Sequence, residues 1–135
     1  GEIKNEKIAP YYYASNIFVL PSSVKAESFG LVQLEAFACS RPVVSTNLPT
    51  GVPFVNLNDK TGLVVPPRDS CALTYAINEL LESSKLCESY GQNGKERTEK
   101  EFTKEKMAKE VSKVYMSLSN WREVLSLHKK KSKGG

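Results

Sequence analysis

Histidine is almost absent from this sequence, which has 135 residues and one histidine, His128, near its end. Pairs of a serine or cysteine nucleophile with a histidine base are therefore not expected. Cysteine is scarce too: Cys39, Cys71 and Cys87 are widely spaced and show no metal-ligand pattern. We expect no bound metal, and three free thiols are typical of a reducing compartment.

Long apolar runs are also missing. No stretch approaches the roughly 18 consecutive apolar residues that a membrane helix needs, and no signal peptide is recognisable. We therefore expect a cytoplasmic protein.

An excess of positive charge is missing from the body of the chain. The formal net charge is +4, but four lysines lie among the last seven residues, and without them fifteen basic side chains balance fifteen acidic ones. A broad nucleic-acid surface needs clustered cations, so nucleic acid is not an expected partner.

The most informative stretch runs from Glu27 to Glu35, Glu-Ser-Phe-Gly-Leu-Val-Gln-Leu-Glu. Before it, Ile17–Leu20 reads as a strand, and after it Arg41–Thr46 reads as a second strand, which predicts a βαβ unit. The intervening loop then lies at the carboxyl end of the first strand, where ligands bind in open parallel sheets. The helix is predicted to begin near Phe29 or Gly30.

Two features of this helix point to ligand binding. Its first amides, those of Gly30, Leu31 and Val32, are expected to face the loop, and free amides at a helix N-terminus suit a phosphate. Glu35 lies among apolar residues nearly all round the helix, so we expect it to be buried, and a buried carboxylate needs a partner.

The spacing of Glu27 and Glu35 resembles the E-x7-E signature of retaining glycosyltransferases of the family 4 type, the group 1 enzymes with the two-domain GT-B fold. Phe29-Gly-Leu-Val32 stands between the glutamates as in that family, and Arg41–Val44 and Thr61–Pro66 also resemble it. The resemblance spans roughly residues 1 to 118.

The resemblance implies a role for each residue. Glu27, the catalytic candidate, would approach the hydroxyls of the donor sugar, Phe29 and the amides of Gly30–Val32 would hold the diphosphate, and Glu35 would bind the ribose. The donor would be UDP- or GDP-linked, with no further cofactor. The residues themselves leave another interpretation open, in which Glu27 is a surface acid and Glu35 an internally bonded structural carboxylate.

The predicted fold is α/β, a truncated Rossmann-like parallel sheet of three to four strands with a long C-terminal helix. Residues 1–128 would be part of the C-terminal nucleotide-sugar-binding domain of a hexosyltransferase that acts in polysaccharide or glycoconjugate synthesis on a glycan or lipid-linked acceptor. The N-terminal domain of the same enzyme would be its partner, and the segment alone would be inactive. Residues 129–135 would form a basic disordered tail, for which contact with anionic lipids at the inner membrane face is an alternative.

Other hypotheses stay open. The chain would otherwise be a non-catalytic flavodoxin-like module that binds a phosphorylated metabolite, or a helical interaction module centred on residues 103–128. The start at Gly1 also suggests a sheet edge beside Ile17–Leu20 that would pair with a second copy.

Several further elements are predicted. Asn5–Ser15 reads as a helix with Asn5 as N-cap, and its three tyrosines as packing residues or, alternatively, ligand-stacking ones. Thr46–Asn58 reads as a loop; its Gly51-x-Pro53 fits the family, which often has glutamate in place of Phe54.

The C-terminal part reads as helical. After a strand at Leu63–Val65, Asp69 is the predicted N-cap of an amphipathic helix. A second helix over Glu82–Glu101 is expected to be interrupted at Gly91 and Gly94. From Thr103 a longer helix carries an apolar stripe, Met107, Val111, Val114, Tyr115, Leu118 and Leu125 with Arg122, which would be partly exposed if the first domain is absent.

Overall fold

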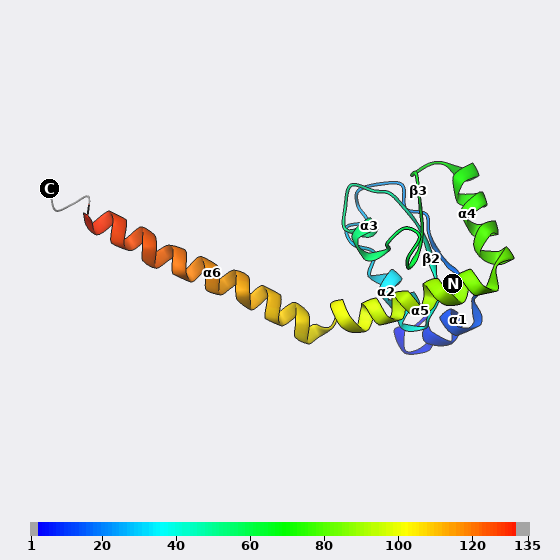
Figure 1. Cartoon of the computed structure of the whole chain (residues 1–135), viewed down its shortest axis with the longest axis horizontal. Coiled ribbons are helices and arrows are strands. Elements are labelled where there is room, and N and C mark those ends of the chain that lie inside the picture. The colour runs from blue at the N-terminus through cyan, green and yellow to red at the C-terminus, as the bar shows by residue number, and fades with distance from the viewer. Residues whose placement is uncertain (1–2, 132–135) are drawn as a thin grey trace. The chain divides into compact units, whose positions relative to one another are not determined.

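The computed structural model describes the backbone of residues 3–131 and the side chains of residues 3–4 and 6–118. The chain divides into two compact units, Gly1–Lys100 and Glu101–Gly135. The first unit contains a parallel three-stranded sheet in the order β1 (Phe18–Leu20), β2 (Val43–Thr46) and β3 (Gly62–Val65) (Figure 1). The α/β fold class and the parallel sheet are therefore as predicted.

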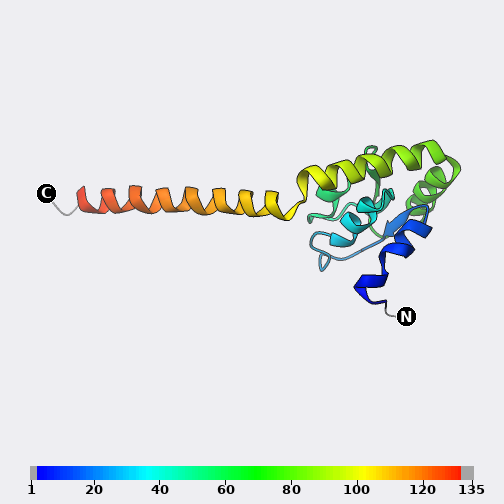
Figure 2. The same ribbon diagram turned by 90° about the horizontal axis from the view of Figure 1, so that it is seen from below.

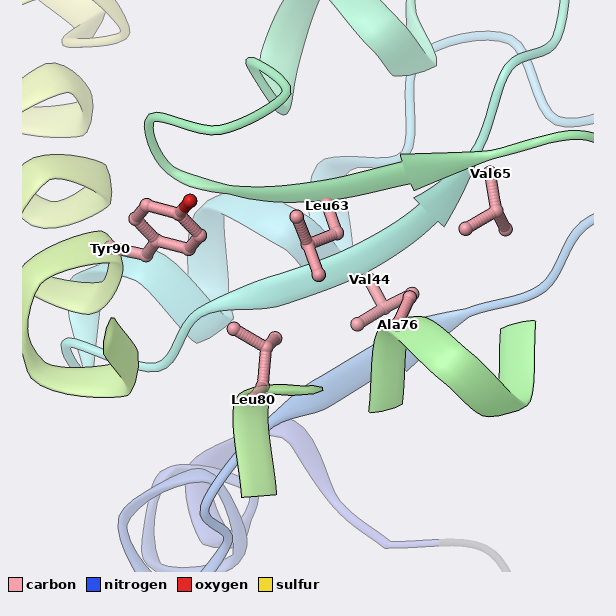
Figure 3. Packing of buried hydrophobic residues seen from close by; sticks show 6 residues of the cluster. All are labelled: Val44, Leu63, Val65, Ala76, Leu80 and Tyr90. Carbon is pink, nitrogen blue, oxygen red and sulfur yellow. The ribbon is translucent and has the colours of Figure 1, made fainter. Parts of the chain in front are cut away.

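Helices α4 (Ser70–Glu82) and α5 (Ser84–Glu101) pack on one side of the sheet. Figure 3 shows side chains of both helices meeting the strands in one buried cluster, made of Val44, Leu63, Val65, Ala76, Leu80 and Tyr90. The predicted N-cap of α4 is present, because Asp69 Oδ1 accepts the amide of Ala72 at 2.8 Å.

Helices α2 (Leu31–Ala38) and α3 (Val52–Val55) also contact the sheet. Their side of the core includes the fully buried Phe37, Val52 and Val55. Helix α3 lies inside the segment predicted as a loop. It is a single turn with Pro53 in its first positions, too short to produce a detectable helical period in the sequence.

Asn56, which follows α3, is fully buried and joins β2 to β3. Its Nδ2 lies 3.1 Å from the carbonyl oxygens of both Val43 and Leu63, and its Oδ1 accepts the Thr61 hydroxyl at 2.9 Å. Gly62 completes the arrangement, since a Cβ there would lie 1.8 Å from the Val43 carbonyl oxygen. The Thr61-Gly62 pair therefore has a packing role at the start of β3.

The predicted helix over Asn5–Ser15 is in fact two pieces, a 3-10 turn at Asn5–Lys7 and helix α1 (Ala9–Ala14). Ile8, not Asn5, is the N-cap of α1, and Pro10 lies in its first turn. Proline has no amide hydrogen and is tolerated only at a helix start, so it sets the beginning of α1.

The predicted interruption of the Glu82–Glu101 helix is wrong, because α5 runs without a break over Ser84–Glu101. Its glycines are packing positions instead. A Cβ on Gly91 would lie 2.1 Å from the Ser40 carbonyl oxygen, and one on Gly94 would lie 2.2 Å from the Phe37 ring. Close approach of α5 to the end of α2 therefore needs both glycines.

The second unit contains α6 (Lys104–Lys131), an uninterrupted helix (Figure 2). Thr103 Oγ1 accepts the amide of Lys106 at 3.2 Å and so caps its start. The predicted apolar stripe is exposed as far as Leu118, whereas the side chains of Arg122 and Leu125 lie outside the described residues. Three residues of the predicted tail, 129–131, belong to α6, and residues 132–135 lie outside the described part.

Candidate functional site

The predicted site residues lie on one loop and the helix that follows it. Glu27, Phe29 and Gly30 belong to the segment between β1 and α2, and the other three, Leu31, Val32 and Glu35, lie on α2. Because this segment leaves the carboxyl end of β1, the fold places it at the edge where parallel sheets bind ligands. The helix begins at Leu31, one or two residues after the start predicted near Phe29 or Gly30.

Gly30 is the N-cap of α2 and has a left-handed backbone, with φ 71° and ψ 53°. Glycine is required for space as well, since a Cβ would lie 2.6 Å from Nε2 of Gln33 and 2.9 Å from Leu20. The Gly30 amide donates to Glu27 Oε1 at 3.0 Å. The predicted catalytic carboxylate and the predicted phosphate-binding helix end are thus brought together.

This contact changes what the helix end offers to a ligand. Of the three amides predicted to face the loop, that of Gly30 already has a carboxylate acceptor. Within the described residues, the amides of Leu31 and Val32 have no acceptor. These two donors and the partial positive charge of the helix end are chemically suited to an anion, and they lie beside the half-buried Glu27.

The predicted burial of Glu35 is wrong, because its side chain is exposed. The hydroxyl of Tyr12, on α1, donates to Glu35 Oε2 at 2.9 Å. Tyr12 is itself buried and packs edge-on against Phe18, with ring centroids 5.5 Å apart. Burial, together with the bond to Glu35 and its charge, raises the pKa of Tyr12 from 10.0 to about 12. Glu35 is therefore an oriented carboxylate with one oxygen held by Tyr12.

Tyr12 was not among the predicted site residues. The sequence offers three consecutive tyrosines, and the structure separates them: Tyr11 and Tyr13 are about 60% exposed. Tyr12 could have been identified only from the register of α1, which turns the middle of the three rings toward α2. Pro10 is the residue of the sequence that sets this register.

The buried polar residue of α2 is Gln33, which is fully buried. Its Nε2 lies 3.3 Å from the carbonyl oxygen of Phe29 and 3.4 Å from that of Val52. Its Oε1 has no hydrogen-bond partner among the described residues. Gln33 therefore connects the site loop to α3, a role that the sequence did not reveal.

A second contact joins the same two segments. The Gly51 amide donates to the Ser28 carbonyl at 2.7 Å, and a Cβ on Gly51 would lie 2.5 Å from the Phe29 ring. The loop after β2 thus lies directly against the site loop, and position 51 needs a glycine because a side chain there would overlap the Phe29 ring.

Phe54, the residue that departs from the resembled pattern, belongs to a small aromatic cluster. Its ring is tilted by 45° against that of Phe29, with centroids 6.4 Å apart, and the guanidinium of Arg97, on α5, lies 5.5 Å from the Phe54 centroid. Arg97 Nη2 also donates to the Phe54 carbonyl at 2.9 Å. The cluster connects the site loop, α3 and α5 at a partly exposed surface.

No group of histidine, cysteine, aspartate and glutamate side chains in the described part of the chain is arranged to hold a metal ion. Among the helices described, none is long and apolar enough to cross a membrane.

The parallel sheet, with helices on both of its faces and a carboxylate at a helix N-terminus beside the end of β1, defines a Rossmann-like domain. The model of the family "glycosyl transferases group 1" matches residues 1–97. The chain belongs to this family of glycosyltransferases.

Individual relatives agree. O-antigen chain mannosyltransferase C of Escherichia coli is 37% identical over 100 residues, which are 74% of this chain and 27% of that protein. Sucrose-phosphate synthase from Thermosynechococcus elongatus superposes with a TM-score of 0.78 at 38% identity, over 89% of this chain and 29% of its own. The C-terminal domain of a group 1 glycosyltransferase from Francisella tularensis gives a TM-score of 0.68 at 30% identity, and the match covers 77% of this chain and 52% of that one. The chain therefore spans about a quarter of the first relative's length, and its GT-B domain fold is established.

Proposed function

We propose that this chain is the donor-binding part of a retaining glycosyltransferase. The parent enzyme would transfer a hexose from a nucleoside diphosphate sugar to a glycan or lipid-linked acceptor in polysaccharide or glycoconjugate synthesis. The observation that carries the proposal is the Glu27 carboxylate on the Gly30 amide, beside the open amides of Leu31 and Val32. Membership of the family and the likeness to a C-terminal domain support it.

Each residue has a role that its geometry permits. The Leu31 and Val32 amides would donate to the diphosphate, which is the group that gains negative charge as the glycosidic bond breaks. Glu27 would accept hydroxyls of the donor sugar. Glu35, with Oε2 held by Tyr12, would present Oε1 to the ribose hydroxyls. Such a site accelerates transfer by positioning and charge stabilisation.

The chain alone is expected not to turn over, because the proposal places the acceptor side in the other GT-B domain. The proposed test is therefore a binding measurement, an amide chemical-shift titration with UDP, GDP and ADP and then with their sugar conjugates. We expect shifts centred on residues 30–35, larger for one base. Shifts confined to other surfaces would overturn the donor site.

Glu27→Gln separates the sugar contact from the helix cap. The amide oxygen of glutamine still accepts the Gly30 amide, while the charge that would bind sugar hydroxyls is lost. We expect affinity for the sugar nucleotide to fall about tenfold, because a hydrogen bond to a charged group is worth roughly 1.5–3 kcal/mol and the neutral one that glutamine still makes about 0.5–1.5 kcal/mol. Affinity for the bare nucleotide should change much less. Equal losses for both ligands would favour a module that binds only the phosphates.

A further inference from the structure

The amino ends of the strands border a hollow of about 280 Å³, at the opposite end of the sheet from the site loop. We call it the amino-end pocket. It lies between the starts of β1 and β2 and the junction of α4 with α5. Its polar and titratable lining residues are Asn16, Ser40, Arg41, Ser84, Cys87 and Glu88. None of them is among the residues proposed to bind the donor.

Arg41 brings a positive charge to the amino-end pocket without a counter-ion. Its side chain is half-buried, and its Nε is buried without a hydrogen-bond partner. The guanidinium forms no ion pair within the described part of the chain. Because a charge that is taken out of water is costly unless an opposite charge accompanies it, the pocket lacks an anion.

The two other titratable groups of the pocket do not supply that anion. Glu88 is exposed and forms no ion pair with any described residue. The Cys87 thiol donates to the Leu80 carbonyl at 3.0 Å. Burial raises the pKa of this thiol, while the Arg41 charge lowers it and the Glu88 charge raises it. The thiol therefore keeps its proton near neutral pH and gives Arg41 no negative partner.

The start of α5 adds hydrogen-bond donors to the same pocket. This helix of 18 residues begins at Ser84, and the amides of Ser84 and Lys85 have no acceptor among the described residues. A helix start also carries a partial positive charge. Asn16 lines the opposite side with a side-chain amide. The guanidinium and the helix start thus favour the same kind of ligand, an oxyanion.

The turn that carries Arg41 is held in place by its neighbours. The Arg41 amide donates to the Ala36 carbonyl at 2.9 Å, and the Ser40 amide donates to the Phe37 carbonyl at 2.8 Å. Gly91 of α5 lies directly against the Ser40 carbonyl. The backbone below the guanidinium is therefore fixed relative to α5 before any ligand arrives.

We propose that the amino-end pocket binds a phosphate group, with Arg41 as its counter-ion and the start of α5 and Asn16 as further donors. A planar guanidinium matches the oxygens of a phosphate. Ligand pockets begin at about 300 Å³, so the ligand is inorganic phosphate or a small phosphomonoester. Because this pocket and the site loop lie at opposite ends of the sheet, the proposal does not depend on the proposed function.

The experiment is an amide chemical-shift titration of the full chain, near neutral pH and at constant ionic strength, with inorganic phosphate and separately with glycerol 3-phosphate. We expect saturable shifts of Asn16, Ser40, Arg41 and residues 84–88. Tighter binding of the ester would identify a phosphorylated metabolite as the ligand, and equal or weaker binding the free ion. Shifts confined to residues 30–35, which report phosphate at the donor site, or shifts that do not saturate, would overturn the proposal.

Three charge variants test the role of Arg41. Arg41→Gln should weaken phosphate binding at least about fivefold, because neutral hydrogen bonds are about half as strong as charge-assisted ones. Arg68→Gln removes the same charge from an exposed side chain beyond the other end of β3 and should leave the affinity unchanged. Glu88→Gln should tighten binding about twofold or more, since it removes a like charge from the pocket. Equal affinities of Arg41→Gln and the parent chain, or equal losses in both arginine variants, would contradict the proposal.

Thermal unfolding gives a second measurement. A ligand that binds only the folded chain raises the unfolding temperature. Phosphate also stabilises proteins by exclusion from their surface, but that effect is the same for all variants. We therefore expect phosphate to stabilise the parent chain and Arg68→Gln more than Arg41→Gln, and equal stabilisation of all three would overturn the site. If Arg41→Gln does not fold, Glu88→Gln decides, because an unchanged affinity in that variant would reject the pocket.

Discussion

Glu35 and Tyr12 form a hydrogen-bonded pair that belongs to two different elements. Tyr12 comes from α1 and Glu35 from α2, and the bond between them is 2.9 Å long. A neutral tyrosine donates this bond, while a tyrosinate would bring a second negative charge against the carboxylate. The pair is therefore stable only while Tyr12 keeps its proton.

This gives a prediction for alkaline pH. The pKa of Tyr12 is raised from 10.0 to about 12 in the folded chain, so the folded state holds the proton more tightly than the unfolded state. The stabilisation is complete below pH 10 and is lost as pH rises from about 10 to about 12. We expect the free energy of unfolding to fall over this window, as measured by denaturant titrations.

Two variants test whether Tyr12 causes this loss of stability at alkaline pH. Tyr12→Phe should remove this part of the alkaline loss, whereas Tyr11→Phe, at an exposed ring, should keep it. An identical pH profile for Tyr12→Phe and the parent chain would contradict the assignment.

At the same scale, Glu35 and Gln33 show the limit of the sequence analysis. The pattern of apolar neighbours placed a polar side chain inside α2, and one is there, but it is Gln33 and not Glu35. Leu31, counted as part of the apolar surround, is 65% exposed. With hydrophobic residues nearly all round an eight-residue helix, periodicity does not identify the buried face. The loop, the helix end and the location of Glu27 followed from strand order and were predictable.

At the scale of elements, the glycines of α5 led to a wrong prediction of a helix break. Tyr90-Gly and Asn93-Gly are turn-like pairs, and nothing local in the sequence distinguishes a break from a packing contact. The distinction lies in the partner, since Ser40 and Phe37 approach the helix where the glycines lack side chains. Only the tertiary structure supplies that information.

Gly94→Ala decides between the two interpretations by the sign of its effect. A glycine that merely interrupts a helix would be improved by alanine, by about 1 kcal/mol. The structure predicts the reverse, a loss of about 1–3 kcal/mol, because the added Cβ overlaps the Phe37 ring. Denaturant unfolding measures it, with Gln92→Ala on the exposed side of α5 expected to stay within about 0.5 kcal/mol.

At the scale of the whole molecule, the two units differ in how they are stabilised. The first has a buried core on both sides of its sheet, whereas α6 carries Met107, Val111 and Val114 exposed. Long exposed apolar stripes favour association with another surface. The first unit is thus expected to fold without α6.

We predict that a chain ending at Glu101 unfolds cooperatively, with a free energy of unfolding within about 1 kcal/mol of the parent chain. It should also associate less, because the stripe is removed. Light scattering over a concentration series measures the association, and circular dichroism the unfolding. A shortened chain that is unfolded would contradict the independent folding of the first unit. A folded one that associates as strongly as the parent chain would show that α6 does not cause the association. In the latter case the edge of β1 becomes the surface to test.

The contacts between the loops after β1 and β2 also bear on how such enzymes diverge and how they are re-engineered. The two segments form one packed block, because Gly51 contacts both Ser28 and Phe29 and because Gln33 bonds to both Phe29 and Val52. A loop transplanted from a relative to change donor preference would arrive without its counterpart. Exchanging residues 21–33 together with 47–55 should give folded chimaeras where exchanging either segment alone does not.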